Sequence, residues 1–246
     1  MCDDLGWGDT GFNGNEIIQT PNLDMLAGQG ITFNRFYSAS AVCSPTRGSC
    51  ITGRNPYRYG IPTANAGHMK KQEITLPELF KEKGYSTGHF GKWHLGTLTT
   101  TTKDANRGKP GDSTHYSIPS MHGYDTWFAT ESKVPTYDPM LKPAQFDTLN
   151  GENLRFGWQA ISDKSEAKPY GTYYWIGEET RDIENLEGDD SRIIVDRLIP
   201  FIETAAEKEQ PFFSTVWFHT PHLPVVATEE MMKKYKKLAY ENPDDL

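Results

Sequence analysis

A run of apolar and β-branched residues late in the chain most constrains the fold. Residues 211–218, Pro-Phe-Phe-Ser-Thr-Val-Trp-Phe, are almost continuously apolar, which is typical of a strand buried on both faces of a parallel sheet. The preceding segment, 189–209, repeats apolar residues at helical spacing, with Pro200 as a predicted kink. A helix that leads into a buried strand is the unit of α/β folds, so we expect a mostly parallel sheet sandwiched by helices.

Other helices and strands are predicted from the signals that start and stop them. Capping residues, prolines and glycines predict one helix from Thr20 to Gly30, one from Thr75 to Gly84 and one over residues 229–238. Alternating side chains predict strands at 31–37 and 85–90. The side chains expected to face inward are Leu23, Leu26 and Ala27 in the first helix and Leu76, Leu79 and Phe80 in the second.

A thiol, a helix start and a fixed cation lie close together in the middle of this pattern. Ser44 can act as N-cap, Pro45 suits the first helical position, and Gly53 can end the helix. Cys43 then lies at the positive end of a short helix, and Arg47 follows it at helical spacing. Negative charge is therefore favoured at Cys43, and the donors of Arg47 suit a tetrahedral oxyanion.

Alternative roles for Cys43 and Arg47 fit the sequence less well. A tyrosine-phosphatase loop places five residues between Cys and Arg, whereas three separate Cys43 from Arg47. A Cys43–Cys50 disulfide would have to cross ~10 Å of helix, beyond the ~7 Å that a bridge tolerates. A buried structural cysteine beside a surface arginine remains the alternative that the residues alone leave open.

Two further groups of polar side chains follow predicted strands. Asp3 and Asp4 are adjacent carboxylates before a glycine-rich loop, which indicates either a hard metal ion between them or an exposed acidic turn. Lys92 and His94 lie two apart in an extended segment, so both can face one anion unless they are simply solvated. Each group thus has a functional and a structural interpretation.

Two histidines follow the strand predicted at 211–218. His219 and His222 lie where the carboxyl end of a buried strand binds ligands in open α/β sheets, and nearby prolines stiffen the loop. His219 fits a structural role equally well.

Composition restricts the partners of the chain. Lys and Arg total 25 against 33 Asp and Glu, a net charge of −8, so neither nucleic acid nor an anionic membrane surface is an expected partner. No apolar run approaches the ~20 residues needed to cross a bilayer. Three cysteines without scaffold-like spacing do not describe a disulfide framework. An anionic substrate would therefore have to be held by a local cluster of cations.

Four segments resemble the type I sulfatases, which depend on formylglycine. Cys43-Ser44-Pro45-Thr46-Arg47 followed by Thr52-Gly53 resembles C-[ST]-P-x-R…[TAR]-G, and residues 84–94 resemble G-Y-x-[ST]…G-K-[WF]-H. Residues 3–9 resemble the opening D-D-[LM]-G-[WY]-G-D, and residues 218–224 resemble F-H-x-P-H-x-P. Cys50 and Phe90 depart from the residues that are usual at their positions.

The resemblance implies an alkaline-phosphatase-like α/β fold and a set of site residues. Cys43 would be oxidised to formylglycine by a formylglycine-generating enzyme, and calcium would be held by Asp3, Asp4 and the modified Cys43. Arg47 would hold the hydrated aldehyde, whose hydroxyl attacks sulfur.

The remaining roles implied by the resemblance concern the sulfate group. Lys92 and His94 would neutralise the sulfate and the leaving oxygen. His222 would contact the sulfate ester and donate the proton, with His94 as its rival for that role.

The resemblance also implies an extent, a compartment and a substrate class. Residues 1–246 are expected to be the amino-terminal part of a single catalytic domain, without its first strand and its carboxyl-terminal part. No signal peptide is visible, although the family implies a periplasmic or secreted protein. Residues 96–129 look closer to bacterial enzymes that act on sulfated polysaccharides than to lipid or steroid sulfatases, so the expected partner is a sulfated small molecule or polysaccharide.

Two functional alternatives stay open. Instead of a sulfatase, the chain could be a phosphonate or phosphodiester hydrolase of the same superfamily, or an inactive, binding-only remnant. The aromatic residues of the long loops either stack on sugar rings or belong to the core: Trp127, Tyr137, Trp158, Tyr173, Tyr174 and Trp175.

Overall fold

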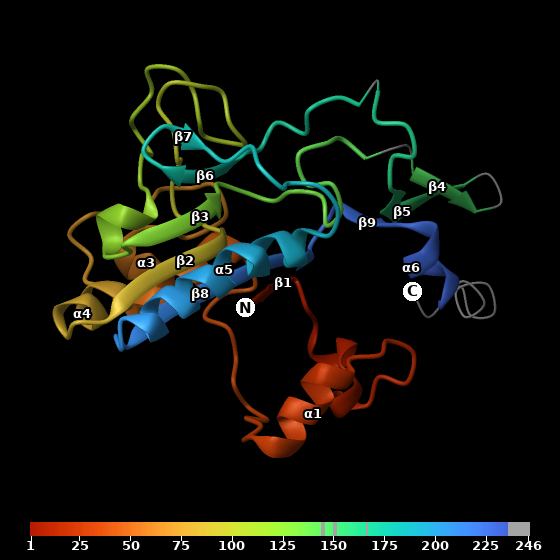
Figure 1. The fold of residues 1–246 in the computed structure, drawn as a ribbon, viewed down its shortest axis with the longest axis horizontal. Coiled ribbons are helices and arrows are strands. Elements are labelled where there is room, and N and C mark those ends of the chain that lie inside the picture. Colours follow the sequence, from red (N-terminus) through yellow and green to blue (C-terminus); the bar gives the residue numbers. More distant parts are fainter. Residues whose placement is uncertain (144–145, 150–151, 166, 236–246) are drawn as a thin grey trace.

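The computed structural model describes residues 1–143, 146–149, 152–165 and 167–235. Within them, the larger sheet has six strands in the order β1-β8-β2-β3-β6-β7 (Figure 1). The strands are β1 (Cys2–Asp3), β2 (Ser86–Lys92), β3 (Thr126–Thr130), β6 (Tyr174–Gly177), β7 (Thr180–Arg181) and β8 (Phe212–Pro221). The first four in this order pair in parallel and the last two antiparallel, which confirms the predicted mostly parallel sheet.

Helices cover both faces of this sheet. Helix α5 (Asp190–Glu207) packs on β8 and β2 and contributes Ile193 and Ile194 to one apolar core. Helices α2 (Cys43–Thr52), α3 (Pro56–Tyr59) and α4 (Leu76–Glu82) belong to the other side. Side chains of β8 alternate between the two cores, with Val216 and Phe218 in the first and Trp217 in the second. The run at 211–218 is therefore a central strand, as predicted.

The remaining elements are short 3-10 helices, two further helices and a second, smaller sheet. Short 3-10 helices η1 (Trp7–Asp9) and η2 (Gly11–Asn13) precede α1 (Pro21–Gln29), and η3 (Pro119–His122) precedes β3. A second sheet has the order β4 (Phe146–Leu149), β5 (Glu152–Gln159) and β9 (Val225–Ala227), followed by α6 (Glu229–Lys233). Thr228 caps α6 as predicted, while the last three residues of the helix predicted at 229–238 lie outside the described residues.

No helix in the described part of the chain is long and apolar enough to cross a bilayer.

Helix α2 begins two residues earlier than predicted. Val42 is its N-cap, and Cys43 is the first helical residue rather than the residue before the cap. The Ser44 hydroxyl is buried inside the first turn and has no hydrogen-bond partner among the described residues, so the prediction that it caps the helix is wrong. Gly53 ends the helix in a left-handed conformation with φ 66°, as predicted.

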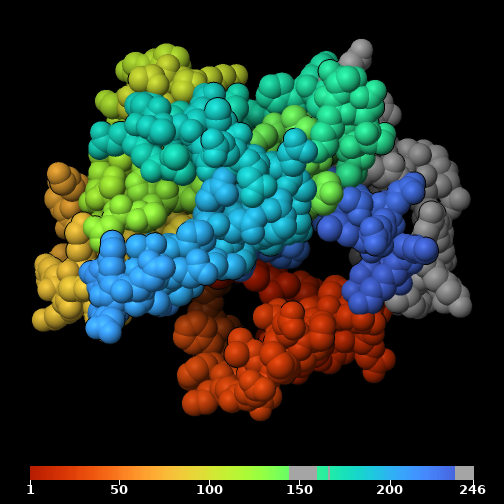
Figure 2. Space-filling view, in the orientation of Figure 1, coloured from red at the N-terminus to blue at the C-terminus, as the bar shows by residue number. Residues whose placement is uncertain are grey.

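The prediction of a strand at 31–37 is wrong. These residues form no strand, and their apolar side chains are exposed, with Ile31 at 83% and Phe36 at 83% of full exposure. The inward face predicted for α1 is also wrong, because Leu26 is 64% exposed. Figure 2 shows this N-terminal segment projecting from the body of the molecule. Periodicity in the sequence therefore did not determine burial here.

The predicted features of α4 are confirmed in part. Thr75 and Glu78 form a capping box, and Phe80 stacks on Phe213 of β8. Leu76 and Leu79 are 39% and 47% exposed, so they do not face inward as predicted. Of the three side chains predicted to face inward, Phe80 is the one that packs on the sheet.

Most of the described loop aromatics belong to the core. Trp127, Tyr174 and Trp175 are at most 5% exposed, so they do not stack on sugar rings. Tyr173 is partly buried and stacks against the guanidinium of Arg181. The side chain of Trp158 lies outside the described residues.

Candidate active site

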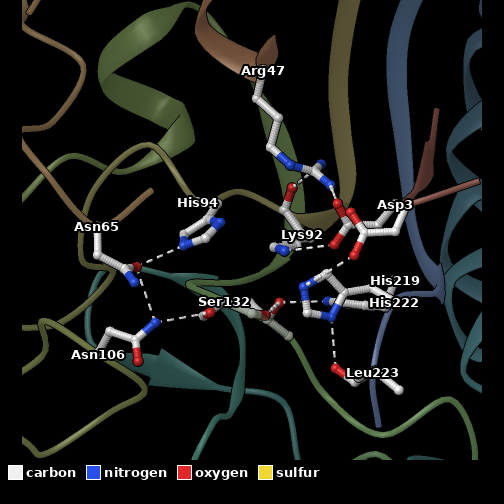
Figure 3. Close-up of polar contacts among 12 residues, drawn as sticks. Asp3, Arg47, Asn65, Lys92, His94, Asn106, Ser132, His219, His222 and Leu223 are labelled. Carbon is white, nitrogen blue, oxygen red and sulfur yellow. Dashed lines mark hydrogen bonds and ion pairs between the residues drawn. The ribbon is translucent and has the colours of Figure 1, made fainter. Parts of the chain in front are cut away.

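Residues far apart in the sequence meet at the carboxyl ends of β1, β2 and β8. Asp3 is the last residue of β1, Lys92 the last of β2, and the loop with His222 follows β8 directly. The first turn of α2 brings Cys43 and Arg47 to the same place, as the polar contacts in Figure 3 show for Arg47. Because these strands run parallel, their carboxyl ends share one edge of the sheet, where such folds bind ligands.

The centre of this site is a buried cluster of one anion and two cations. Asp3 Oδ1 lies 2.9 Å from Arg47 Nη2, and Asp3 Oδ2 lies 2.5 Å from Lys92 Nζ (Figure 3). Arg47 Nη1 also donates to the Lys92 carbonyl at 3.0 Å. All three side chains are at most 4% exposed. Two cations against one anion leave one net positive charge in the interior, which favours an incoming oxyanion.

The pKa values follow from this arrangement. Burial raises the pKa of the Asp3 carboxyl, but the charges of Arg47 and Lys92 outweigh it and bring that pKa below its ordinary value. Burial and the charge of Arg47 lower the pKa of Lys92, against the opposing effect of Asp3. The carboxylate therefore stays ionised between its two cations.

Cys43 and His222 form a second pair beside the cluster. Single ligand atoms of Asp3, Cys43 and His222 all lie within 4.8 Å of one another. Burial raises the pKa of the Cys43 thiol, yet the hydrogen bond with His222 and the charge of Lys92 bring it below its ordinary value. The same hydrogen bond raises the pKa of His222. The pair therefore favours an anion at Cys43 and a proton on His222.

The orientation of the His222 ring is fixed by its loop. Its Nδ1 lies 2.6 Å from the carbonyl oxygen of Leu223, which can only accept, so Nδ1 carries a proton. Its Nε2 lies 3.5 Å from Asp4 Oδ2. Nε2 is thus the nitrogen that faces the site.

The two adjacent aspartates differ in their surroundings. Asp3 is buried, whereas the side chain of Asp4 is 59% exposed and its backbone is left-handed with φ 63°. Asp4 is therefore open to solvent. The sequence predicted both carboxylates as metal ligands, and only Asp3 belongs to the close group with Cys43 and His222 among the described residues.

His94 lies beside Lys92 but binds a different partner. The ring is 3% exposed, and its Nε2 lies 2.8 Å from Asn65 Oδ1 (Figure 3). Asn106 Nδ2 donates to the same oxygen at 3.0 Å and to Ser132 Oγ at 3.0 Å. These amide and hydroxyl residues were not predicted from the sequence, because single polar residues in loops belong to no motif.

His219 has a structural role. Its Nδ1 lies 2.8 Å from Asp190 Oδ2 and its Nε2 lies 2.8 Å from Thr130 Oγ1, and the ring is fully buried. Asp190 also accepts a hydrogen bond from Tyr174. Both ring nitrogens are thus satisfied, and His219 connects the end of β8 to the start of α5 and to β3. Of the two alternatives for His219, the structure supports the structural one.

The fold and the site together define an α/β protein with two buried cations next to a cysteine at a helix N-terminus. The sequence profile described as Sulfatase matches residues 1–245, and the chain belongs to this family. The chain is 32% identical to N-acetylgalactosamine-6-sulfatase of Mus musculus over 94% of its own length. It is 29% identical to arylsulfatase G of Mus musculus over 98% of its own length. It spans 41% and 43% of these two relatives.

The solved structures agree with this assignment. The crystal structure of Ps i-CgsB superimposes on 97% of the chain with a TM-score of 0.70 and 25% identity, and the match covers 48% of that protein. A second structure of Ps i-CgsB, in complex with k-i-k-neocarrahexaose, gives a TM-score of 0.64 at 25% identity. The predicted sulfatase resemblance and the sulfatase type of α/β fold are thereby confirmed.

Proposed function

We propose that this chain carries the nucleophile and the anion-binding cations of an enzyme that hydrolyses sulfate esters of carbohydrates. The observation that carries the proposal is Cys43 on the first turn of α2, with Arg47 and Lys92 buried beside it around Asp3. The names of the relatives support sulfate-ester hydrolysis. A phosphonate or phosphodiester substrate is the alternative, which an assay on matched esters separates.

Arg47 and Lys92 bind the nonbridging oxygens of the sulfate group in this proposal. Both are at most 1% exposed, and the single carboxylate of Asp3 does not neutralise them. A cation held in place before the reaction stabilises charge that develops on the oxygens without reorganising solvent. The planar fork of Arg47 matches two oxygens of a tetrahedral oxyanion.

His222 is the proposed proton donor to the leaving oxygen. Its Nδ1 is held by the Leu223 carbonyl, and its Nε2 faces the site. The raised pKa of His222, which the hydrogen bond with Cys43 causes, keeps the ring protonated closer to neutral pH. The proton on Nε2 is therefore available to an alkoxide.

Cys43 is the proposed site of conversion to formylglycine by a formylglycine-generating enzyme. A thiolate would form an adduct with sulfur that has no easy exit. The hydrated aldehyde supplies an oxygen nucleophile in its place. The half-buried position of Cys43 beside Arg47 and Lys92 suits an anionic oxygen as well as a thiolate.

The oxygen donors of the site are of the chemical type that calcium binds. Asp3, Asp4 and a modified Cys43 offer the hard oxygens that calcium prefers, whereas the nitrogen of His222 does not. Bound there, the ion would polarise the nucleophile and the sulfate oxygens. Calcium takes about six to eight oxygen ligands, so these three side chains do not complete its shell. One carboxylate oxygen of Asp3 would have to exchange its contact with Arg47 or Lys92 for the metal.

A sulfated carbohydrate is the proposed substrate, and export to the periplasm or beyond the cell is the proposed location. One relative is named for N-acetylgalactosamine 6-sulfate, and one similar structure holds an oligosaccharide. The compartment follows from the family resemblance alone.

Mass spectrometry of the tryptic peptide from Phe36 to Arg47 tests the nucleophile. The protein is coexpressed with a formylglycine-generating enzyme, and the aldehyde mass is expected at Cys43. A Cys43→Ala variant is the matched control. An unmodified thiol under these conditions would favour the binding-only remnant.

Hydrolysis of matched sulfate and phosphonate esters of one sugar tests the reaction. Faster release from the sulfate ester is expected, and it should depend on added calcium. A preference for the phosphonate would replace the proposed substrate class while leaving the nucleophile in place.

A further inference from the structure

The His94 ring has one nitrogen with a partner and one without. Nε2 lies 2.8 Å from Asn65 Oδ1, and Nδ1 has no hydrogen-bond partner among the described residues. The ring itself is only 3% exposed. Buried polar atoms without a partner are uncommon, and a ligand that supplies the missing contact would account for this one.

The partner of Nε2 determines where the proton of the neutral ring lies. An amide oxygen can only accept, so Nε2 must carry the hydrogen and Nδ1 must hold a lone pair. Burial and the positive charges of Lys92, Arg107 and Arg47 hold the pKa of His94 well below its ordinary value, and His222 adds to this effect. The ring is therefore neutral at pH 7 and can accept at Nδ1 but cannot donate there.

Asn65 is held so that its oxygen faces His94. Asn106 donates to the second lone pair of the same oxygen and also to Ser132, which fixes the orientation of the Asn65 amide. The Asn65 backbone is left-handed with φ 63°, a conformation that Asn tolerates better than most residues. Arg107 donates to the carbonyl of Gly67 at 2.8 Å and holds the same loop.

The His94 backbone supports a functional role for the ring. His94 has φ 55°, also left-handed, although it lies only two residues after the end of β2. Non-glycine residues in this region carry strain, which gathers at functional sites. Figure 3 shows the ring between Asn65 and the cluster of Asp3, Lys92 and Arg47.

We propose that Asn65 is a positioning residue that holds His94 in the Nε2–H tautomer. The lone pair on Nδ1 then accepts a hydrogen bond from a hydroxyl group of the nucleophile or the substrate. Because Nδ1 of His94 cannot donate, His222 rather than His94 is the proton donor to the leaving oxygen. The roles of His94 and His222 in catalysis rest on the proposed function. The tautomer of His94 does not, because it is a property of the chain itself.

Nitrogen-15 NMR of the histidine rings in the whole chain tests the tautomer without any activity. The His94 signals are assigned by their loss in His94→Gln. A protonated Nε2 and an unprotonated Nδ1 are expected. An Nδ1–H tautomer in the unaltered protein would overturn the proposal.

Two variants of Asn65 separate the effect of its hydrogen bond to His94 from the effect of its left-handed backbone. Asn65→Gly keeps the left-handed conformation and removes the amide, so a mixture of tautomers is expected. Asn65→Asp keeps an acceptor oxygen, so the Nε2–H tautomer should persist. The carboxylate should also raise the pKa of His94 and move the acidic limb of the kcat profile to higher pH. Unchanged tautomers in Asn65→Gly would contradict the proposal, and if that variant does not fold, loss of the Nε2–H tautomer in Asn65→Asp would do so.

Asn185→Gly is the matched control. Asn185 is also exposed and left-handed, with φ 49°, but it lies between β7 and α5 and donates to Asp196 instead. Its variant should leave the His94 signals and the rate unchanged. In an active preparation, Asn65→Gly should lower kcat about tenfold or more with little change in KM, as expected for an acid–base group that loses its orientation. Absence of sulfatase activity with the expected tautomer would reject the proposed function and leave the positioning role intact.

Discussion

The site buries charged side chains, whereas the N-terminal segment at residues 5–40 exposes apolar ones. At the carboxyl ends of β1, β2 and β8, even charged groups are buried, and Arg47 and Lys92 are each 1% exposed. In the N-terminal segment, large apolar groups stay exposed, such as Trp7 at 72% and Phe33 at 72%. Contacts across the sheet, rather than residue type, therefore decide which side chains are buried. Substitutions in the first region should therefore have large effects and those in the second small ones.

The largest effect is expected for Arg47→Ala. The variant leaves Asp3 and Lys92 without their shared partner and removes a donor aimed at the sulfate oxygens. Losing one partner of a buried ion pair costs about 3–5 kcal/mol, and losing one donor to a developing oxyanion costs about 10²–10³ in kcat. Urea unfolding and steady-state kinetics measure the two effects. Arg35→Ala in the N-terminal segment is the control, and an intact kcat in Arg47→Ala would remove Arg47 from the mechanism.

Two glycines with positive φ test whether packing is tighter in the site region than in the N-terminal segment. Gly91 in β2 has φ 109°, and a Cβ there would lie 2.0 Å from the Trp217 carbonyl oxygen. Gly14 has φ 98° and nothing within 4 Å of a Cβ. Both Gly→Ala variants carry left-handed strain of about 1–3 kcal/mol, but only Gly91→Ala must also displace β8. Thermal unfolding should show a clearly lower Tm for Gly91→Ala, and equal losses would contradict the difference between the regions.

The pH dependence of stability should come from the buried carboxylate. The folded-state pKa of Asp3 is lowered, so its contribution is fully present above the unfolded pKa of about 3.9 and is lost as pH falls through the folded pKa. The free energy of unfolding, measured by urea between neutral and acidic pH, should therefore decline at the acid end. Asp3→Asn should remove this part of the slope. Asp24→Asn, in the exposed segment, should leave it.

The smallest effect is expected for Phe36→Ser. Phe36 is 83% exposed, and exposed substitutions usually change stability by less than about 0.5 kcal/mol. Phe90→Ala is the matched comparison, because Phe90 of β2 is 1% exposed and packs against Phe201 of α5. Its loss should cost about 3–5 kcal/mol. Denaturant midpoints measure both. A large loss for Phe36→Ser would mean that the N-terminal segment stabilises the fold more than its exposure indicates.

Local signals in the sequence predicted the elements that carry the site. The capping box of Thr75 and Glu78, the stop at Gly53 and the apolar run of β8 are each fixed by neighbours within a few residues. Such signals failed at 31–37, where alternation was present but no strand formed. An alternating segment becomes a strand only when another strand pairs with it, and pairing depends on distant parts of the chain.

Helical spacing is a local property, so the sequence alone was enough to place Cys43 and Arg47 together at the start of one helix. The sequence also determined the sulfatase family through its motifs. The position of Asp3 between Arg47 and Lys92, which are 44 and 89 residues away, comes from the folded chain, as does the contact of Asn65 with His94. Strand order and loop position bring these groups together, and no spacing along the chain records where parallel strands end relative to one another.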